Sequence, residues 1–95
     1  SEGASVQVGE MTFQVWHTPG HTVGSSCYLL EDTLFSGDTV FYHDIGRTDL
    51  PGGSMQQMRQ SLARILAWPT DLHILPGHGE ATTLEQEREY LKVYL

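Results

Sequence analysis

Residues 17–25 have the sequence HTPGHTVGS, and Pro19 and Gly20 mark this stretch as a loop. On both sides of it, short stretches either alternate between polar and apolar residues or are mostly apolar, as β-strands are. The predicted strands are residues 5–8, 12–16, 26–30, 34–36 and 71–75. His21 therefore lies in a loop between two strands of a predicted sheet.

Two helices are predicted from their capping residues and their apolar spacing. Ser54 begins a capping box, and the apolar residues after it fall on one helical stripe. That stripe consists of Met55, Met58, Leu62, Ile65 and Leu66. Pro69 ends this helix, because its ring cannot continue one. The second helix is predicted over about residues 83–94, with Thr82 and Thr83 both candidate caps.

Strands and helices in mixed order predict an α+β fold, a single mixed β-sheet with two helices on one face. The 95 residues form at most one domain, residues 1–95. We expect residues 1–5 to be a flexible lead-in. We also expect residues 39–53 to form a long loop, because three glycines and one proline interrupt them. Loops of that length in compact domains often carry function.

Composition and charge argue against several classes of protein. Five Lys and Arg against twelve Asp and Glu give a net charge of −7, which disfavours nucleic acid or an anionic membrane as partner. No apolar stretch approaches the roughly 20 residues that cross a bilayer, and the N-terminus has no signal-peptide pattern. The single cysteine, Cys27, excludes an intramolecular disulfide. We therefore expect a cytoplasmic protein.

Three side chains suited to metal binding follow strand ends in glycine-containing loops: His21, Asp38 and His78. Strand ends of one sheet can meet at a common rim, and two imidazoles with a carboxylate suit a metal such as Zn²⁺. Each residue also has an ordinary explanation, since histidines after Pro-Gly are often solvated and aspartates after Gly often stabilise turns. The residues alone leave both interpretations open.

The other histidines have weaker claims to a function. His73 lies within a predicted strand, where a packing or surface role is expected. His17 precedes His21 by four residues, but the proline between them removes the helical spacing that would place both on one face. His43 is either a loop ligand or without function. We expect Cys27 to be a small buried apolar residue.

Four motifs, in this order along the chain, resemble those of the metallo-β-lactamase superfamily. HTPGHTVGS at 17–25 is similar to its metal-binding loop, LFSGDT at 34–39 to its bridging-aspartate strand, and ILPGHG at 74–79 to its last histidine motif. IGRTDLPGG at 45–53 resembles the branch that contains glyoxalase II-like hydrolases and persulfide dioxygenases. The similarity covers about residues 6–89. It implies half of an αββα sandwich.

The resemblance implies a role for each matching residue. His21 corresponds to the third histidine of the first metal site, Asp38 to the carboxylate that bridges both metals, and His78 to the histidine of the second site. Arg47 corresponds to a residue that contacts the glutathione part of the substrate in glyoxalase II enzymes. Zinc is the implied metal, with iron or manganese as alternatives. In the family, metal-activated water attacks a thioester, so Asp38 is the one candidate for a direct part in catalysis.

The family's first motif, His-x-His-x-Asp-His, is absent from this sequence. Three of the family's seven metal ligands are present, so the chain resembles the C-terminal half of the fold. We therefore expect half of a glyoxalase II-like thioester hydrolase, weak or inactive by itself. The alternatives are a non-catalytic oligomeric remnant, which holds no metal, and a fragment of a persulfide dioxygenase-like iron protein. Of that protein's ligands, only His21 and Asp38 would remain.

The missing half would leave one face of the sheet bare. Candidates for the two faces of the sheet are Val6, Val8, Phe13, Val15, Tyr28, Leu30 and Phe35. An exposed apolar patch of several hundred Å² typically marks an interface. We expect a homodimer through this face. A chain that carries the missing N-terminal half is the alternative partner.

Overall fold

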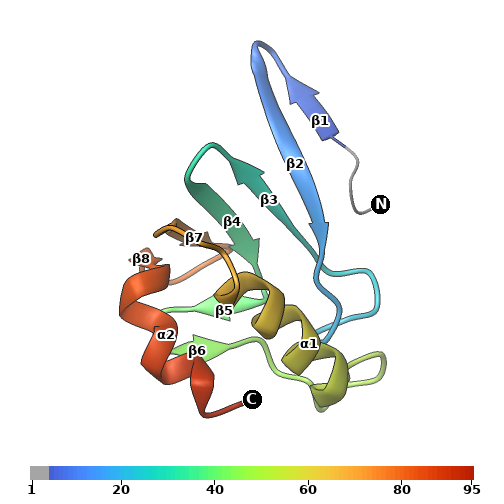
Figure 1. Cartoon of the computed structure of the whole chain (residues 1–95). Coiled ribbons are helices and arrows are strands. Elements are labelled where there is room, and N and C mark those ends of the chain that lie inside the picture. Colours follow the sequence, from blue (N-terminus) through green and yellow to red (C-terminus); the bar gives the residue numbers. More distant parts are fainter. Residues whose placement is uncertain (1–4) are drawn as a thin grey trace.

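The computed structural model describes residues 5–95 and shows one six-stranded sheet with both helices on the same face (Figure 1). The strands are β1 Ser5–Val8, β2 Met11–His17, β3 Ser26–Leu30, β4 Thr33–Gly37, β5 Val40–Phe41, β6 Asp44–Ile45, β7 His73–Pro76 and β8 Thr82–Thr83. The helices are α1 Met55–Leu66 and α2 Leu84–Lys92. No helix of this part of the chain is long and apolar enough to cross a membrane.

The strands follow the order β1-β2-β3-β4-β7-β8, and β5 and β6 form a separate hairpin. Neighbouring strands are antiparallel except β4 and β7, which are parallel. Because a parallel pair cannot be joined by a tight turn, the chain between them forms the hairpin and α1. The predicted mixed sheet with two helices on one face is confirmed.

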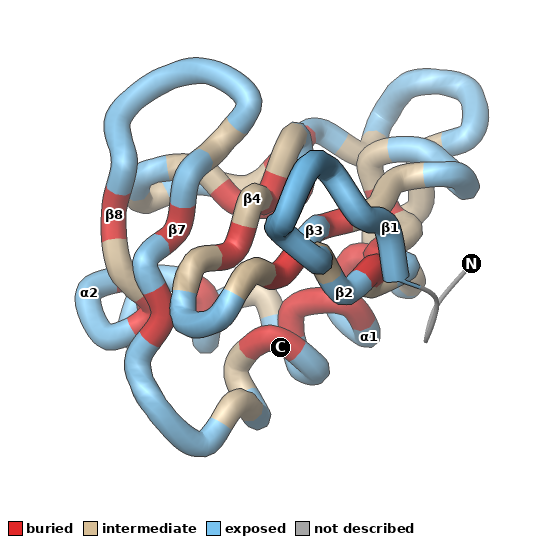
Figure 2. Tube along the Cα trace, turned by 90° about the horizontal axis from the view of Figure 1, so that it is seen from above, coloured by how far each residue is buried: buried red, intermediate tan, exposed pale blue. Residues whose placement is uncertain are grey.

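The core lies between the sheet and the helices. Leu29, Leu34, Ile74 and Thr82 form a buried row across β3, β4, β7 and β8. Figure 2 shows the resulting alternation of buried and less buried residues along β4. The predicted stripe of α1 packs against this row, and α2 adds two buried leucines. The helices are therefore held mainly by apolar burial, at about 1.5–3 kcal/mol for each large side chain.

The opposite face of the sheet is covered by no helix of the described residues (Figure 1). Val15, Tyr28, Phe35 and Leu75 form a cross-strand row on it, from β2 to β7. The seven side chains predicted for the two faces all lie on this one face, by register and by alternation along each strand. Five of them, Val6, Val8, Phe13, Tyr28 and Phe35, line a hollow of about 420 Å³. We call this surface the outer face.

Both predicted helices are present and capped. The Ser54 side chain accepts a hydrogen bond from the backbone N–H of Gln57 at 3.2 Å. Thr83 caps α2, whereas Thr82, the other candidate, lies in β8 and its hydroxyl donates to Glu87. The second helix ends two residues earlier than predicted, at residue 92 instead of 94.

The prediction of an irregular loop over residues 39–53 is wrong in its first half. Val40–Phe41 and Asp44–Ile45 form the β5–β6 hairpin. Strands of two residues are too short to show alternation, and the turn places His43 at φ 56°, where glycine is usual. Ser5 belongs to β1 and not to a lead-in. The rest of the expected lead-in, residues 1–4, lies outside the described residues.

Candidate metal centre at the rim of the sheet

His21, Asp38 and His78 meet at one rim of the sheet, in the loops that follow β2, β4 and β7. The carboxylate lies between the two imidazoles. Its Oδ2 is 3.8 Å from Nε2 of His21, and its Oδ1 is 3.8 Å from Nδ1 of His78. The structure thus brings together the three side chains that the strand-end argument selects. Their role as metal ligands stays a prediction.

The end of the parallel pair β4–β7 sets Asp38 beside His78. The Gly77 N–H donates to the Gly37 carbonyl at 2.9 Å, beyond the last regular rung of the pair. Gly37 adopts φ 52°, in the left-handed region that glycine tolerates best. Because the residue after each glycine is a site residue, this one contact fixes the spacing of both.

The loop that carries His21 is fixed against α1. The backbone N–H of Ser54, at the start of the helix, donates to the Gly20 carbonyl at 2.7 Å. Ser61 Oγ donates to the carbonyl of the residue before Gly20, also at 2.7 Å. A Cβ on Gly20 would lie 2.6 Å from Cα of Met58, so only glycine permits this approach. The helix therefore helps to position His21, a candidate ligand, although none of the three candidate ligands lies on the helix.

Buried hydroxyl groups connect the His21 loop to the Asp38 loop. The Thr18 hydroxyl lies 3.1 Å from the Thr39 hydroxyl and 3.3 Å from the Cys27 sulfur, and all three residues are buried. Burial raises the pKa of the Cys27 thiol above its ordinary value of 9.0. A protonated thiol is neither a nucleophile nor a metal ligand, so Cys27 has the packing role that was predicted.

The His21 ring is oriented by the hairpin segment. Its Nδ1 lies 2.8 Å from the carbonyl oxygen of Arg47, and a carbonyl only accepts, so Nδ1 carries the hydrogen. In the neutral ring the lone pair is then on Nε2, 3.8 Å from the Asp38 carboxylate. Two acceptors this close repel unless a proton or a cation lies between them. Metal-binding histidines typically have this kind of backbone partner.

The donor set fits a divalent transition-metal ion. Imidazole nitrogens and carboxylate oxygens are usual ligands of zinc and iron. His21 and His78 approach opposite oxygens of Asp38, so the carboxylate is arranged as a bridge between two positions. Within residues 5–95, no group of three or more His, Cys, Asp or Glu side chains forms a metal site by itself. Metal binding by the trio therefore stays a prediction.

The trio opens into a cleft of about 700 Å³. Its other lining residues are Phe41, Tyr42, Asp44, Ile45, Gly46, Arg47, Gly79 and Glu80. Most of these come from the β5–β6 hairpin and the residue after it, within the stretch predicted to be a functional loop. The Phe41 ring packs against the His78 ring, with centroids 5.0 Å apart. The hairpin thus forms an aromatic wall next to the candidate ligands.

Gly46 is a site residue to which the sequence analysis assigned no role. A Cβ at this position would lie 1.7 Å from the Asp38 carbonyl oxygen and 3.2 Å from Cβ of His21. Its N–H donates to the Thr39 carbonyl at 3.1 Å. Only glycine lets the chain pass this close to both ligand loops. The sequence signal that could have identified Gly46 is its place in the IGRTD motif, residues 45–49.

The Arg47 side chain pairs with Asp49. Nε and Nη2 donate to the two carboxylate oxygens at 2.7 and 2.9 Å. This pair raises the pKa of Arg47 and lowers the pKa of Asp49. Arg47 is one of the residues that line the cleft, and its backbone carbonyl contacts Nδ1 of His21. The substrate contact implied for Arg47 stays a prediction.

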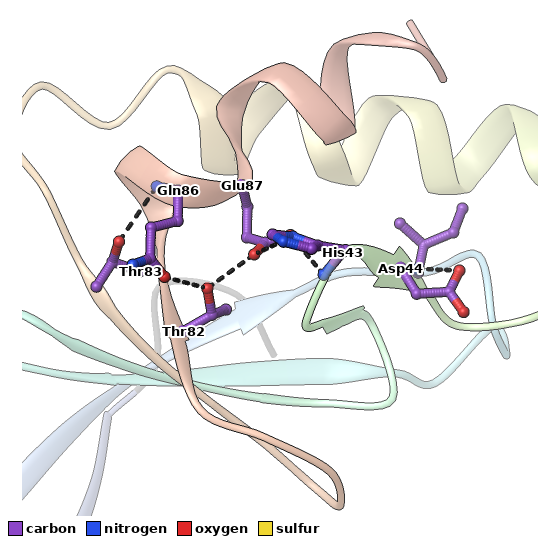
Figure 3. Close-up of polar contacts among 7 residues, drawn as sticks. His43, Asp44, Thr82, Thr83, Gln86 and Glu87 are labelled. Atoms are coloured by element: carbon purple, nitrogen blue, oxygen red, sulfur yellow. Dashed lines mark hydrogen bonds and ion pairs between the residues drawn. The ribbon is translucent and has the colours of Figure 1, made fainter.

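The remaining histidines do not join the trio. His17 Nε2 lies 2.8 Å from the Val23 carbonyl, and His73 is exposed in β7. His43 contacts the carboxylate of Glu87, with Nδ1 3.0 Å from Oε2 (Figure 3). Glu87 is fully buried and was missed by the sequence analysis. The sequence carried a signal for it, because residue 87 lies three positions after Leu84 and four before Leu91, at the helical spacing of two leucines that are buried in α2.

Comparison with known proteins identifies the family of this chain. Residues 2–90 match the family described as the Metallo-beta-lactamase superfamily, and the chain belongs to this superfamily. It is similar to the Hydroxyacylglutathione hydrolase GloC of Haemophilus influenzae, at 34% identity over 90 residues. That alignment covers 92% of this chain and 42% of GloC.

Two solved structures are also similar. ETHE1 from Myxococcus xanthus has a TM-score of 0.89 and 36% identity, over 96% of this chain and 43% of that one. TTHA1623 in a di-iron-bound form has a TM-score of 0.78 and 40% identity, over 82% of this chain and 40% of that one. The chain spans less than half the length of each of these relatives. The resemblance to the C-terminal half of the family fold is confirmed.

Proposed function

We propose that this chain supplies half of a metal-dependent centre that hydrolyses glutathione thioesters, and that it is weak or inactive without further ligands. One observation carries the proposal. The two oxygens of Asp38 each lie 3.8 Å from a different imidazole nitrogen, within a 700 Å³ cleft. A carboxylate between two imidazoles is the ligand arrangement of a bridged metal pair. The likeness to GloC supports the substrate class.

The chain's own residues would hold the metal and orient the substrate. His21 with one Asp38 oxygen, and His78 with the other, give two ligands for each position. When bound, the metal supplies Lewis-acid activation of water and of the thioester carbonyl. Catalytic zinc sites take three protein ligands, so two per position predict weak binding. Arg47, at the wall of the cleft, is proposed to contact the glutathione part of the substrate.

We propose zinc as the metal, with iron as the alternative. The di-iron-bound form of TTHA1623 is the observation that favours iron. An iron-holding chain would fit the persulfide dioxygenase-like alternative, whereas a chain that holds no metal would fit the non-catalytic remnant. A cytoplasmic location belongs to the same proposal. It is supported by the buried unpaired thiol of Cys27, which suits a reducing compartment.

We further propose that the outer face packs against the outer face of a second copy. The cross-strand row on it carries no charge, and its members Tyr28 and Leu75 are exposed. A second copy would supply the second sheet of the αββα sandwich that the family resemblance implies. Burying about 500 Å² per copy would gain on the order of 10 kcal/mol each, before the entropy cost of association.

Metal content and turnover test the function together. The protein is purified without chelator from cells given zinc or iron, and its metal content per chain is measured. Hydrolysis of S-lactoylglutathione is then assayed. We expect metal at up to one ion per chain and slow turnover, both lost in Asp38→Asn. His73→Asn, in the same sheet but outside the cleft, is the matched control. Equal metal content in wild type and Asp38→Asn would contradict the proposal.

A further inference from the structure

Three aromatic rings stack between the cleft and α2. The His43 ring lies between Tyr42 and Tyr90, with centroids 3.8 and 3.7 Å away and interplanar angles of 27° and 18°. Tyr42 lines the cleft, and Tyr90 belongs to α2. The stack therefore connects a wall of the candidate site to a helix that contributes no ligand.

Buried Glu87 fixes the middle ring of the stack. Its Oε1 accepts the His43 backbone N–H at 2.7 Å, and its Oε2 lies 3.0 Å from Nδ1 of the same residue (Figure 3). The Thr82 hydroxyl donates to Oε2 at 2.7 Å. A carboxylate without solvent contact depends on these donors, since leaving it unpaired costs several kcal/mol. The backbone and the ring of His43 are thus both held in place.

The geometry at His43 is costly without this support. Its φ of 56° lies in the left-handed region, which non-glycine residues occupy at a cost of order 1–3 kcal/mol. Such conformations persist where the surroundings determine them, often at functional sites. The Glu87 contacts and the two flanking rings provide those surroundings. These contacts stabilise the turn in this conformation, and Tyr42 is the turn residue that lines the cleft.

We propose that His43 is a positioning residue that acts through Tyr42. With Glu87 and Tyr90, it fixes the Tyr42 phenol ring as a specificity-determining surface that packs against the apolar part of the thioester substrate. One face of the Tyr42 ring is covered by His43, which leaves its other face and its edge for the cleft. The identity of the substrate rests on the proposed function, whereas the stack itself does not.

His43→Asn tests this proposal. Asparagine tolerates the left-handed conformation and keeps a polar side chain, but it removes the ring. NMR of ring-labelled tyrosine measures the Tyr42 signals, and titration with S-lactoylglutathione gives a Kd in the same samples. In wild type, we expect the Tyr42 signals to show ring-current shifts and to move with the thioester. In His43→Asn, we expect those shifts to disappear. We expect Kd to rise about three- to tenfold, which is the effect of losing one aromatic stacking contact.

Two further variants separate positioning from general destabilisation. Tyr90→Phe keeps the ring and should retain wild-type signals and Kd, whereas Tyr90→Leu should behave as His43→Asn does. Unchanged Tyr42 signals, or an unchanged Kd, in His43→Asn would overturn the proposal. If wild type does not bind S-lactoylglutathione at all, the proposed function and the substrate role of Tyr42 are both wrong. If wild type and His43→Asn bind it equally, only the positioning role is wrong.

Discussion

Nδ1 of His21 lies 2.8 Å from the carbonyl oxygen of Arg47. This contact joins the loop after β2 to the segment after β6, and it leaves Nε2 as the nitrogen nearest Asp38. The orientation of a candidate metal ligand therefore depends on a backbone oxygen from another motif. Mutations that shift the hairpin relative to the rim can therefore test this contact.

Gly46→Ala should displace that hairpin. The added Cβ would lie 1.7 Å from the Asp38 carbonyl oxygen, so the backbone must move, at a cost of about 1–3 kcal/mol in unfolding free energy. Zinc affinity should also fall, because the Arg47 carbonyl moves away from His21. Urea unfolding and zinc titration measure the two effects. Gly24→Ala is the matched control, since no atom lies within 4 Å of its added Cβ and its stability should be unchanged or slightly higher.

Glu87→Gln should destabilise the fold through the hairpin anchor. The amide keeps the volume of the side chain, but it replaces a charged oxygen that faces the Thr82 hydroxyl and Nδ1 of His43 with an NH₂ group, so these contacts must reverse direction and lose their charge assistance. The expected loss is about 1–3 kcal/mol, measured by thermal or urea unfolding. Glu89→Gln on the same helix is exposed and should change stability by less than about 0.5 kcal/mol. Equal stability of the two variants would show that the buried carboxylate is not an anchor.

Cys27 predicts a specific dependence of stability on pH. The pKa of its thiol is raised by burial above 9.0, so above that pH the unfolded chain loses the proton while the folded chain keeps it. Fewer protons bound in the unfolded state mean that stability falls as pH rises. The difference in unfolding free energy between wild type and Cys27→Ala should therefore shrink above a pH of about 9. A difference that is constant with pH would contradict this.

Leu75→Lys tests the outer face. Leu75 pairs with Phe35 in the cross-strand row, so a lysine there places a charge on the surface proposed to self-associate. Light scattering with size exclusion should give about twice 10.6 kDa for wild type and 10.6 kDa for the variant. Val93→Lys is the control, because Val93 is exposed beyond the end of α2 and should leave the dimer intact. A wild-type monomer at micromolar concentration would exclude the homodimer.

Local patterns were sufficient to predict most of the sheet and both helices. Alternation identified β1 and β2, and short, mostly apolar stretches identified β3, β4 and β7. Ser54 and Thr83 marked the helix starts through their capping chemistry. The two-residue strands of the hairpin were missed, because alternation needs more residues. The turn gave no glycine signal, since His43 holds the left-handed conformation through tertiary contacts with Glu87.

The three candidate ligands could be predicted from the sequence, but the contacts that hold them in place could not. His21, Asp38 and His78 were selected because strand ends can meet at a rim, and the structure brings them together. The Arg47 carbonyl and the Ser61 side chain contact residues 26 and 42 positions away in the chain, and Gly46 packs against the Asp38 loop and against the more distant His21. Gly46 lies in the IGRTD motif, but its close approach to the Asp38 and His21 loops depends on how the hairpin packs, which the motif alone does not reveal.

The attachment of the His21 loop to α1 affects the order in which parts of the structure unfold. Strand pairing between β2 and β3 does not depend on that helix, whereas the rim position of His21 does. Detachment of α1 would release His21 from the rim, whereas Asp38 and His78 would stay adjacent through the contact between Gly77 and Gly37. On mild heating or with added denaturant, the proposed metal binding should therefore be lost before the β-strands unfold.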